Sequence, residues 1–566
     1  MIENRPLPLD KRWVWTAAIG LAFFLLIQVF PISGQLFSMN TSTVLTRAEA
    51  EQRAIVWAAD KFGVAASDIN KTTVTHMTDS RTNGYLSKQA LTGEYDKLWA
   101  AATPTDVYVV ELYVNGTPGS LAVSLHMESG DLVAWRHVEE SSGRDGDGPA
   151  SEEKATADQA ANALQYASSF GIRSGDWEWT GVRLASGGFE YASRQDNIGE
   201  AKLLLQVDSP STVGSTPSAS WQGGTVAYRV ELPKSFIDYM DNQEQWASML
   251  SVFGFILPQV LLFILAIIYT GTHGGHSSYR RGIFLALVFF ALYAGLTYNM
   301  IPGLRAGTWE AGIRGGDTVS VTVSLVTYAA MALLTYFSAV GGDGLWKSMG
   351  RSLWPRWRES GYGEAVLKSM KEGYFLAFIL LGAQSVILLL LEKSLGAFAS
   401  SDATQSMYNM TIPLLLPLMA WCAGISEELQ SRLFGIGVFR SWFVGLARKL
   451  KGGEPSKRTV VVLTTLAIVP PGLFWALGHV GYAVYPVYTR VIELVLLSFL
   501  FGWFMLRFGL MTVIFAHVTL DAILMGMQMM FDGLPGDFAG GVFSLIFPGL
   551  VGIVIWRLHG AIRPKT

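Results

Sequence analysis

The C-terminal half of the chain is a succession of long apolar runs separated by short polar loops. A helix that crosses a bilayer needs about 20 apolar residues, and the runs after residue 246 approach or exceed that length. Together with an earlier run, this hydropathy pattern predicts about ten membrane-spanning helices. The predicted spans lie near 13–30, 248–270, 282–303, 318–341, 374–392, 411–436, 459–482, 490–506, 509–530 and 540–556.

Between the first two spans, the composition is that of a soluble domain. Two stretches resemble each other: 50–54 followed by Phe62-Gly63, and 157–161 followed by Phe170-Gly171. Each predicts an amphipathic helix that ends at a glycine.

Strand-like alternation follows each helix, most clearly at 107–114, 121–127 and 132–138. Turns are predicted at Asn115-Gly116 and at Ser129-Gly130-Asp131. A stretch rich in Ser, Gly and Asp at 140–151 would link two small α+β modules. The helix–hairpin order resembles PepSY-type domains, which implies binding or sensing and an extracytoplasmic ligand for residues 36–246.

The distribution of Lys and Arg orients the bundle. With ten spans, the loops rich in Lys and Arg all fall on the N-terminal side, which the positive-inside rule makes cytoplasmic. Both termini are then cytoplasmic and the soluble domain lies outside. The run at 13–30 is interpreted as an uncleaved signal anchor, because no small-x-small cleavage site follows Pro31. The alternative is a cleaved secretory signal peptide.

The predicted fold is an all-α polytopic membrane bundle of about ten transmembrane helices with an inserted extracytoplasmic α+β domain. The predicted divisions are a signal-anchor helix at 1–35, the tandem α+β domain at 36–246, membrane helices two to five at 247–395, and a catalytic membrane bundle at 396–566.

Composition supports this class of protein. Half of the residues are hydrophobic and only 15% are charged, whereas soluble proteins are about a quarter charged. The net charge of −3 gives no reason to expect a nucleic-acid partner. The single cysteine, Cys422, excludes a disulfide framework and a cysteine-based zinc site.

Ionisable residues inside predicted spans cost roughly 2.5–3.5 kcal/mol each at mid-helix and are therefore candidates for function. The span at 411–436 contains Glu427, Glu428 and Arg432. Glu428 and Arg432 are four residues apart, so they share a helix face and can pair. Glu427 points about 100° away and has no local partner, which leaves it available for chemistry. The alternative is that all three form a packing network.

Two further spans contain histidines. His479 follows the helix-breaking Pro470-Pro471-Gly472, and irregular backbone at membrane depth usually lines a cavity. His517 and Asp521 are four residues apart and share a face. A lone histidine is more often structural, and a His–Asp pair can simply join two helices. Together with a buried glutamate, however, these groups can activate a water and stabilise an oxyanion, with or without a metal.

The series Glu427-Glu428-x-x-x-Arg432, Trp475-x-x-x-His479 and His517-x-x-x-Asp521 resembles the motifs of the CPBP family. That family groups type II CAAX prenyl endopeptidases with bacteriocin-processing and immunity-type membrane proteins. The run 502–509 before the last histidine is also similar, and the likeness covers about 410–530. The resemblance implies an intramembrane endopeptidase in the plasma membrane of a bacterium.

The resemblance also implies roles for the site residues. Glu427 would activate the attacking water, and Glu428 and Arg432 would order the site. His479 would assist Glu427 or bind a metal, and His517 and Asp521 would polarise the scissile carbonyl or complete a metal site.

Two positions depart from the family pattern: Trp475 stands where Phe is usual, and Asp521 where Asn is common. A charged Asp521 favours a metal, which would be Zn²⁺ held by Glu427, His479, His517 and Asp521.

The expected separation of His479 and Glu427 along the bundle argues against a shared site. If the span begins at Thr459, His479 lies about 30 Å along a straight helix, whereas Glu427 is expected nearer the cytoplasmic side. The two would meet only if the span begins deeper or the chain doubles back at Pro470-Pro471-Gly472, and we expect the latter.

The sequence thus predicts hydrolysis of peptide bonds in a membrane protein or peptide substrate by a glutamate-activated water, since no Ser or Cys stands beside a base as a nucleophile. The alternative is a non-catalytic membrane sensor or bacteriocin-immunity-type binding protein, which would not depend on Glu427. A transporter with a proton relay is a third class, but the spans contain no inverted repeat.

Overall fold

The computed structural model describes most of the chain, in the ranges 10–32, 44–116, 119–138, 156–209, 224–310 and 316–562. The predicted linker at 140–151 and the basic residues Arg563 and Lys565 lie outside the described residues.

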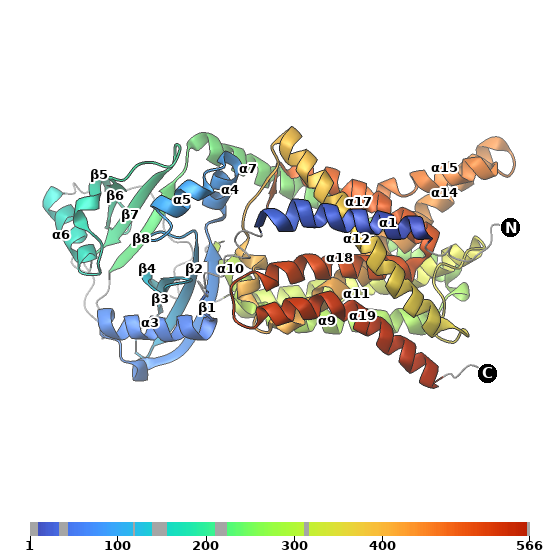
Figure 1. The fold of residues 1–566 in the computed structure, drawn as a ribbon, viewed down its shortest axis with the longest axis horizontal. Coiled ribbons are helices and arrows are strands. Elements are labelled where there is room, and N and C mark those ends of the chain that lie inside the picture. Colours follow the sequence, from blue (N-terminus) through green and yellow to red (C-terminus); the bar gives the residue numbers. More distant parts are fainter. Residues whose placement is uncertain are drawn as a thin grey trace.

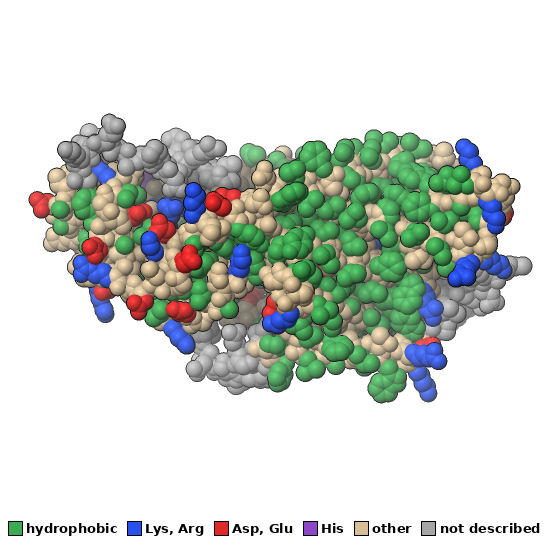
Figure 2. Space-filling view, turned by 90° about the horizontal axis from the view of Figure 1, so that it is seen from above, with side chains coloured by type: hydrophobic (Ala, Val, Ile, Leu, Met, Phe, Trp, Pro, Cys, Tyr) green, Lys and Arg blue, Asp and Glu red, His purple; other side chains and the backbone are tan. Residues whose placement is uncertain are grey.

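A β-sheet domain lies at one end of a long helical bundle (Figure 1). Helix α1 (Lys11–Phe24) begins at the end of the bundle away from the sheet domain, and α19 (Asp537–Ile562) ends there. Hydrophobic side chains cover the middle of the bundle in Figure 2, and Lys and Arg gather at its end away from the sheet domain. The chain is a multi-pass membrane protein; which end is cytoplasmic stays a prediction.

The domain contains one antiparallel sheet of eight strands, in the order β1-β2-β3-β4-β8-β7-β6-β5. Its two halves join where β4 pairs with β8, with Trp135 opposite Val226. The strands are β1 (Ile69–Thr78), β2 (Asp106–Val114), β3 (Ser120–His126), β4 (Leu132–Val138), β5 (Trp177–Arg183), β6 (Phe189–Ser193), β7 (Lys202–Asp208) and β8 (Thr225–Glu231). The three most clearly predicted strands thus correspond to β2, β3 and β4.

Each half of the sheet follows a helix that the sequence predicted. Helix α3 (Arg47–Phe62) begins at a capping box and ends at Gly63, whose φ of 68° suits glycine. Helix α6 (Ala157–Ser168) also begins at a capping box but ends at Ser169, so its predicted glycine end is two residues too late. Two short helices, α4 (Ser80–Gln89) and α5 (Thr92–Leu98), separate β1 from β2.

Among the described residues, nine helical segments are long and apolar enough to span a membrane. They are Lys11–Val29, Lys234–His276, Tyr279–Asn299, Asp317–Ser348, Tyr362–Leu395, Lys457–Leu477, Val487–Phe508, Leu510–Met530 and Asp537–Ile562. The second of these segments contains α7 (Lys234–Met249) and α8 (Leu257–His273), and the sixth contains α15 (Lys457–Leu466) and α16 (Val469–Leu477). The others after the first are single helices: α9 (Tyr279–Asn299), α11 (Asp317–Ser348), α12 (Tyr362–Leu395), α17 (Val487–Phe508), α18 (Leu510–Met530) and α19 (Asp537–Ile562).

The predicted span at 411–436 is not among the nine. The structure forms it as α13 (Leu416–Glu427), a π-helical stretch η10 (Glu428–Ile436) and α14 (Gly437–Lys451). Its three central ionisable residues set it apart from the apolar helices. Nevertheless α13 packs against α9 and α18 inside the bundle, so the count of ten stays a prediction.

The predicted break is present, because α15 ends at Leu466 and α16 begins at Val469, but the chain does not double back at Pro470-Pro471-Gly472. Residues Lys457–Leu477 form one helical segment of spanning length, and the prolines occupy the first turn of α16, where a missing N–H breaks no helical bond. The helix that contains the predicted span at 411–436 is longer than that span. The helix through Glu427 runs on to Lys451, and α14 and α15 extend beyond the rest of the bundle (Figure 1).

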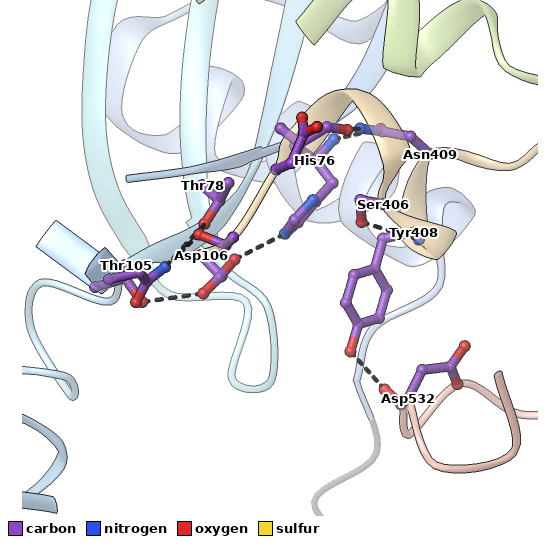
Figure 3. Close-up of polar contacts among 12 residues, drawn as sticks. His76, Thr78, Thr105, Asp106, Ser406, Tyr408, Asn409 and Asp532 are labelled. Carbon is purple, nitrogen blue, oxygen red and sulfur yellow. Dashed lines mark hydrogen bonds and ion pairs between the residues drawn. The ribbon is translucent and has the colours of Figure 1, made fainter. Parts of the chain in front are cut away.

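Two features connect the sheet domain to the bundle. The first is the continuous helix Lys234–His276, which contains the predicted domain boundary at 246. The second is a polar junction shown in Figure 3. The backbone N–H of His76 donates to Asn409 Oδ1 over 2.8 Å, and Asn409 Nδ2 donates back to the His76 carbonyl over 2.9 Å. The Tyr408 hydroxyl donates to the Asp532 carbonyl over 2.7 Å. Strand β1 is thus bonded to the loop that leads into α13.

Candidate active site

Glu427 and Glu428 lie at the point where α13 passes into the π-helical stretch η10. Such local π-helical turns are frequent at functional sites. One carboxylate oxygen of Glu427, Oε2, accepts a hydrogen bond from the indole N–H of Trp475 on α16. The other oxygen, Oε1, lies 3.9 Å from Nε2 of His479.

His479 follows the end of α16, and a backbone hydrogen bond sets its orientation. Its Nδ1 lies 2.8 Å from the carbonyl oxygen of Trp475. Since a carbonyl can only accept, Nδ1 carries the hydrogen, and Nε2 of the neutral ring carries the lone pair. His479 therefore presents a hydrogen-bond acceptor on its Glu427 side.

His517 lies in α18 and contacts both glutamates and Asp521. Its Nδ1 is 2.8 Å from Glu428 Oε1. Its Nε2 is 3.5 Å from Asp521 Oδ2 and 3.9 Å from Glu427 Oε2. Two imidazole Nε2 atoms thus approach the carboxylate of Glu427, one at each oxygen.

Arg432 supplies the positive charge behind these groups. Its Nη1 lies 3.3 Å from Glu428 Oε1, and its guanidinium lies 4.2 Å from the ring centre of Trp475 and 4.9 Å from that of Phe501. None of its side-chain nitrogens makes a hydrogen bond with the described residues. The Glu428 charge and the aromatic faces therefore stabilise the buried cation.

Exposure divides the six predicted residues into two sets. The side chains of Glu427, His479 and Asp521 are 18% to 25% exposed. Those of Glu428, Arg432 and His517 are 5% exposed or less. The structure brings all six together; the first set can meet a substrate, and the second lies behind it.

The predicted zinc set does not have the geometry of a metal site. In the part of the chain that the structure describes, no group of three or more His, Cys, Asp or Glu side chains is arranged to hold one metal ion. The donor types alone would suit zinc. Zinc therefore stays a prediction, and no step of the mechanism below depends on it.

Two residues beside this cluster were not assigned a role from the sequence. Trp475 was interpreted as a replacement for Phe, yet its indole N–H binds Glu427, which a Phe could not do. Tyr482 stacks on His479, with ring centres 5.6 Å apart and planes 17° apart. Its position three residues after His479, in the break between α16 and α17, was the available signal.

Residues 409–523 match the family model described as Rce1-like, type II CAAX prenyl endopeptidase Rce1-like. The match confirms the resemblance to the CPBP family and contains all six residues of the cluster. It covers about a fifth of the chain and none of the sheet domain. Neither the search of curated proteins nor the search of solved structures returns a match.

Proposed function

We propose that this chain is an intramembrane endopeptidase that hydrolyses peptide bonds of membrane-associated substrates with a water activated by Glu427. One observation carries the proposal. The partly exposed carboxylate of Glu427 has an imidazole Nε2 3.9 Å from each oxygen, within a segment that matches type II CAAX prenyl endopeptidases.

The orientation of Glu427 selects its basic oxygen. Oε2 accepts the Trp475 N–H, so Oε1 on the His479 side is the oxygen that takes the proton of the water. A water bonded to both Oε1 and His479 Nε2 would donate one hydrogen to each. This orients its lone pair toward a substrate carbonyl, as general-base catalysis requires.

The reaction then proceeds in two steps. Glu427 removes one proton from the water, the water oxygen bonds to the carbonyl carbon, and the carbonyl π pair moves onto the carbonyl oxygen. In the second step the carbonyl re-forms, the C–N bond breaks, and Glu427 passes the proton to the leaving nitrogen. The products are a new carboxyl group and a new amine.

The buried set keeps the catalytic side chains in position. Glu428 accepts from His517 Nδ1, which directs His517 Nε2 toward Asp521 and Glu427. Arg432 balances the charge of Glu428 at a site with almost no access to water. Glu428 thus holds the ring of His517, and Arg432 balances the negative charge of Glu428.

The test is N-terminal peptide mapping of membranes from cells that express the wild-type chain, Glu427→Gln or Glu454→Gln at matched levels. Glu454 is an exposed residue paired with Arg448, so this variant is a control for the same chemical change. We expect new N-termini with the wild type and Glu454→Gln but not with Glu427→Gln, a loss of at least ~10³-fold. Their positions also reveal the depth and the sequence at which the substrate is cleaved.

Identical maps for the wild type and Glu427→Gln would overturn the hydrolytic function and favour the sensor or immunity-type binding protein. The zinc prediction is tested with the purified full-length chain. Cleavage that is lost on chelation and restored by Zn²⁺ would replace the glutamate-only mechanism with a zinc-assisted one.

A further inference from the structure

The partly exposed residues of the cluster lack a free hydrogen-bond donor, and the unbonded N–H groups of Arg432 lie behind them on a side chain that is 1% exposed. Hydrolysis places a negative charge on the scissile carbonyl oxygen, which is stabilised by an N–H or O–H group aimed at it. Glu427 and Asp521 are carboxylates, which only accept when ionised. The indole N–H of Trp475 is bonded to Glu427. Another group must therefore stabilise the oxyanion.

The histidines do not fill this role. The Nδ1 hydrogens of His479 and His517 face the Trp475 carbonyl and Glu428, respectively. Should either ring become charged, its Nε2 hydrogen faces a carboxylate, Glu427 for His479 and Asp521 for His517. Each neutral ring thus has an acceptor for the one hydrogen it carries, whereas the Nε2 hydrogen of a charged ring would lie 3.9 Å (His479) or 3.5 Å (His517) from a carboxylate oxygen.

Tyr482 is a neutral donor beside the partly exposed residues of the cluster. Its ring stacks on His479, its residue is 41% exposed, and its hydroxyl makes no hydrogen bond to any described residue. It lies close enough to Glu427 and Asp521 to interact electrostatically with both. A tyrosine hydroxyl, with an ordinary pKa of about 10, keeps its hydrogen at neutral pH.

A chain of contacts from two other helices supports the ring of Tyr482. The guanidinium of Arg490 lies 5.1 Å from the ring centre. Arg490 Nη1 binds both oxygens of Glu493, at 3.0 and 2.8 Å. The buried Glu493 also accepts from Gln384 Nε2 on α12 over 2.8 Å. The ring is thus held on one side of the catalytic groups by α12 and α17, which preorganises its hydroxyl.

We propose that the hydroxyl of Tyr482 donates a hydrogen bond to the carbonyl oxygen of the scissile bond as negative charge develops there. The inference rests on the proposed peptidase function. Tyr482 keeps its proton throughout: the hydrogen bond forms as the π pair moves onto oxygen and weakens when the C=O bond re-forms and the C–N bond breaks.

The experiment measures kcat and KM of the purified full-length chain on a peptide that contains the mapped cleavage site. Four proteins are compared: wild type, Tyr482→Phe, Tyr488→Phe and Glu427→Gln. Tyr488 is a half-exposed residue of α17 and controls for the loss of one hydroxyl. We expect Tyr482→Phe to lower kcat by ~10²–10³-fold with KM nearly unchanged, and Tyr488→Phe to behave as wild type.

The outcomes separate this inference from the proposed function. If the wild type cleaves, Glu427→Gln does not, and Tyr482→Phe remains within twofold of wild type, the role of Tyr482 is wrong while the peptidase stands. If the wild type does not cleave, the peptidase itself fails.

A second pair of variants guards against a folding defect. Tyr482→Gln retains a side-chain N–H donor, whereas Tyr482→Met has similar bulk and none. We expect the Gln variant to retain more kcat than the Met variant at equal thermal midpoints. Equal kcat values for the two would contradict a donor role.

Discussion

Two of the places where the molecule encloses carboxylates surround them differently. In the active-site cluster, Glu428 faces Arg432 and His517, both nitrogen groups that are positively charged or able to become so. At the junction with the sheet domain, Asp532 faces a second carboxyl, Asp537. Burial raises the pKa of Asp532 to about 7; the backbone N–H of Leu534 opposes the shift and the charge of Asp537 adds to it.

This difference shows how a buried carboxylate is put to use. One with a cation beside it holds its neighbours in place, as the proposed mechanism requires of Glu428. One with a like charge beside it holds a proton near neutral pH. The junction, which joins β1 to the loops around α13 and α18, should therefore respond to pH in the range below neutrality.

The largest loss of stability is expected when Arg432, the cation beside Glu428, is replaced. Replacing it with Met leaves Glu428 buried without its cation and should lower the free energy of unfolding by about 3–5 kcal/mol. The measurement is the thermal midpoint of the detergent-solubilised protein. Arg448→Met removes the cation of an exposed pair with Glu454. It should change the free energy of unfolding by less than ~1 kcal/mol. Equal shifts for the two variants would show that burial of the pair does not matter.

A smaller effect is expected at the junction from Asn409→Ala. The Asn409 side chain satisfies the N–H and C=O of His76 and also donates to the Ala403 carbonyl over 2.8 Å. Leaving such buried groups unpaired costs about 1–3 kcal/mol, so the β1 amides near His76 should exchange hydrogen faster. The control is Asn70→Ala, which removes an exposed bond to Asn115 at the other end of β1. Unchanged exchange at His76 would mean that the sheet domain docks without this bond.

The smallest effect is the pH dependence from Asp532. Its pKa is raised on folding, so the folded state holds a proton that the unfolded state releases, and this contribution to stability falls as pH rises from about 4 to about 7. Asp532→Asn should match the wild type near pH 4 and exceed it by about 1–2 kcal/mol at pH 8, because solvent screening and the shared proton reduce the full shift.

Thermal midpoints across this pH range test the expectation. The exposed Asp60→Asn on α3 is the matched control and should follow the wild type at every pH. If the thermal midpoints of the wild type and Asp532→Asn changed in parallel with pH, Asp532 would not hold a proton at the junction.

Local patterns predicted much of the fold because they act within a few residues. Alternation of apolar and polar positions located β2, β3 and β4, and apolar runs located the nine spanning segments. Patterns did not indicate that the two small modules share one sheet, since the pairing of Trp135 with Val226 joins residues far apart in sequence. A ligand for residues 36–246 stays a prediction.

The candidate site likewise combines contacts that local spacing predicted and contacts that it did not. The spacing of Glu428 and Arg432 predicted their pairing, and that of His517 and Asp521 their shared face. The donor to Glu427 was not predicted, because the indole of Trp475 reaches it only once α16 packs beside η10. The continuation of the helix from Glu427 to Lys451 was also not predicted.

The sequence by itself determined that this chain spans a membrane and that ionisable residues at set spacings lie within its spans. Bilayer thickness sets the length of an apolar span, and the cost of burying charge makes ionisable residues within a span stand out, so both features can be recognised in single segments. Only the tertiary structure decided which carboxylate is exposed and which is enclosed, and that Tyr482 stands free beside His479. Those properties depend on side chains that separate helices bring within a few ångströms, at distances that no local spacing specifies.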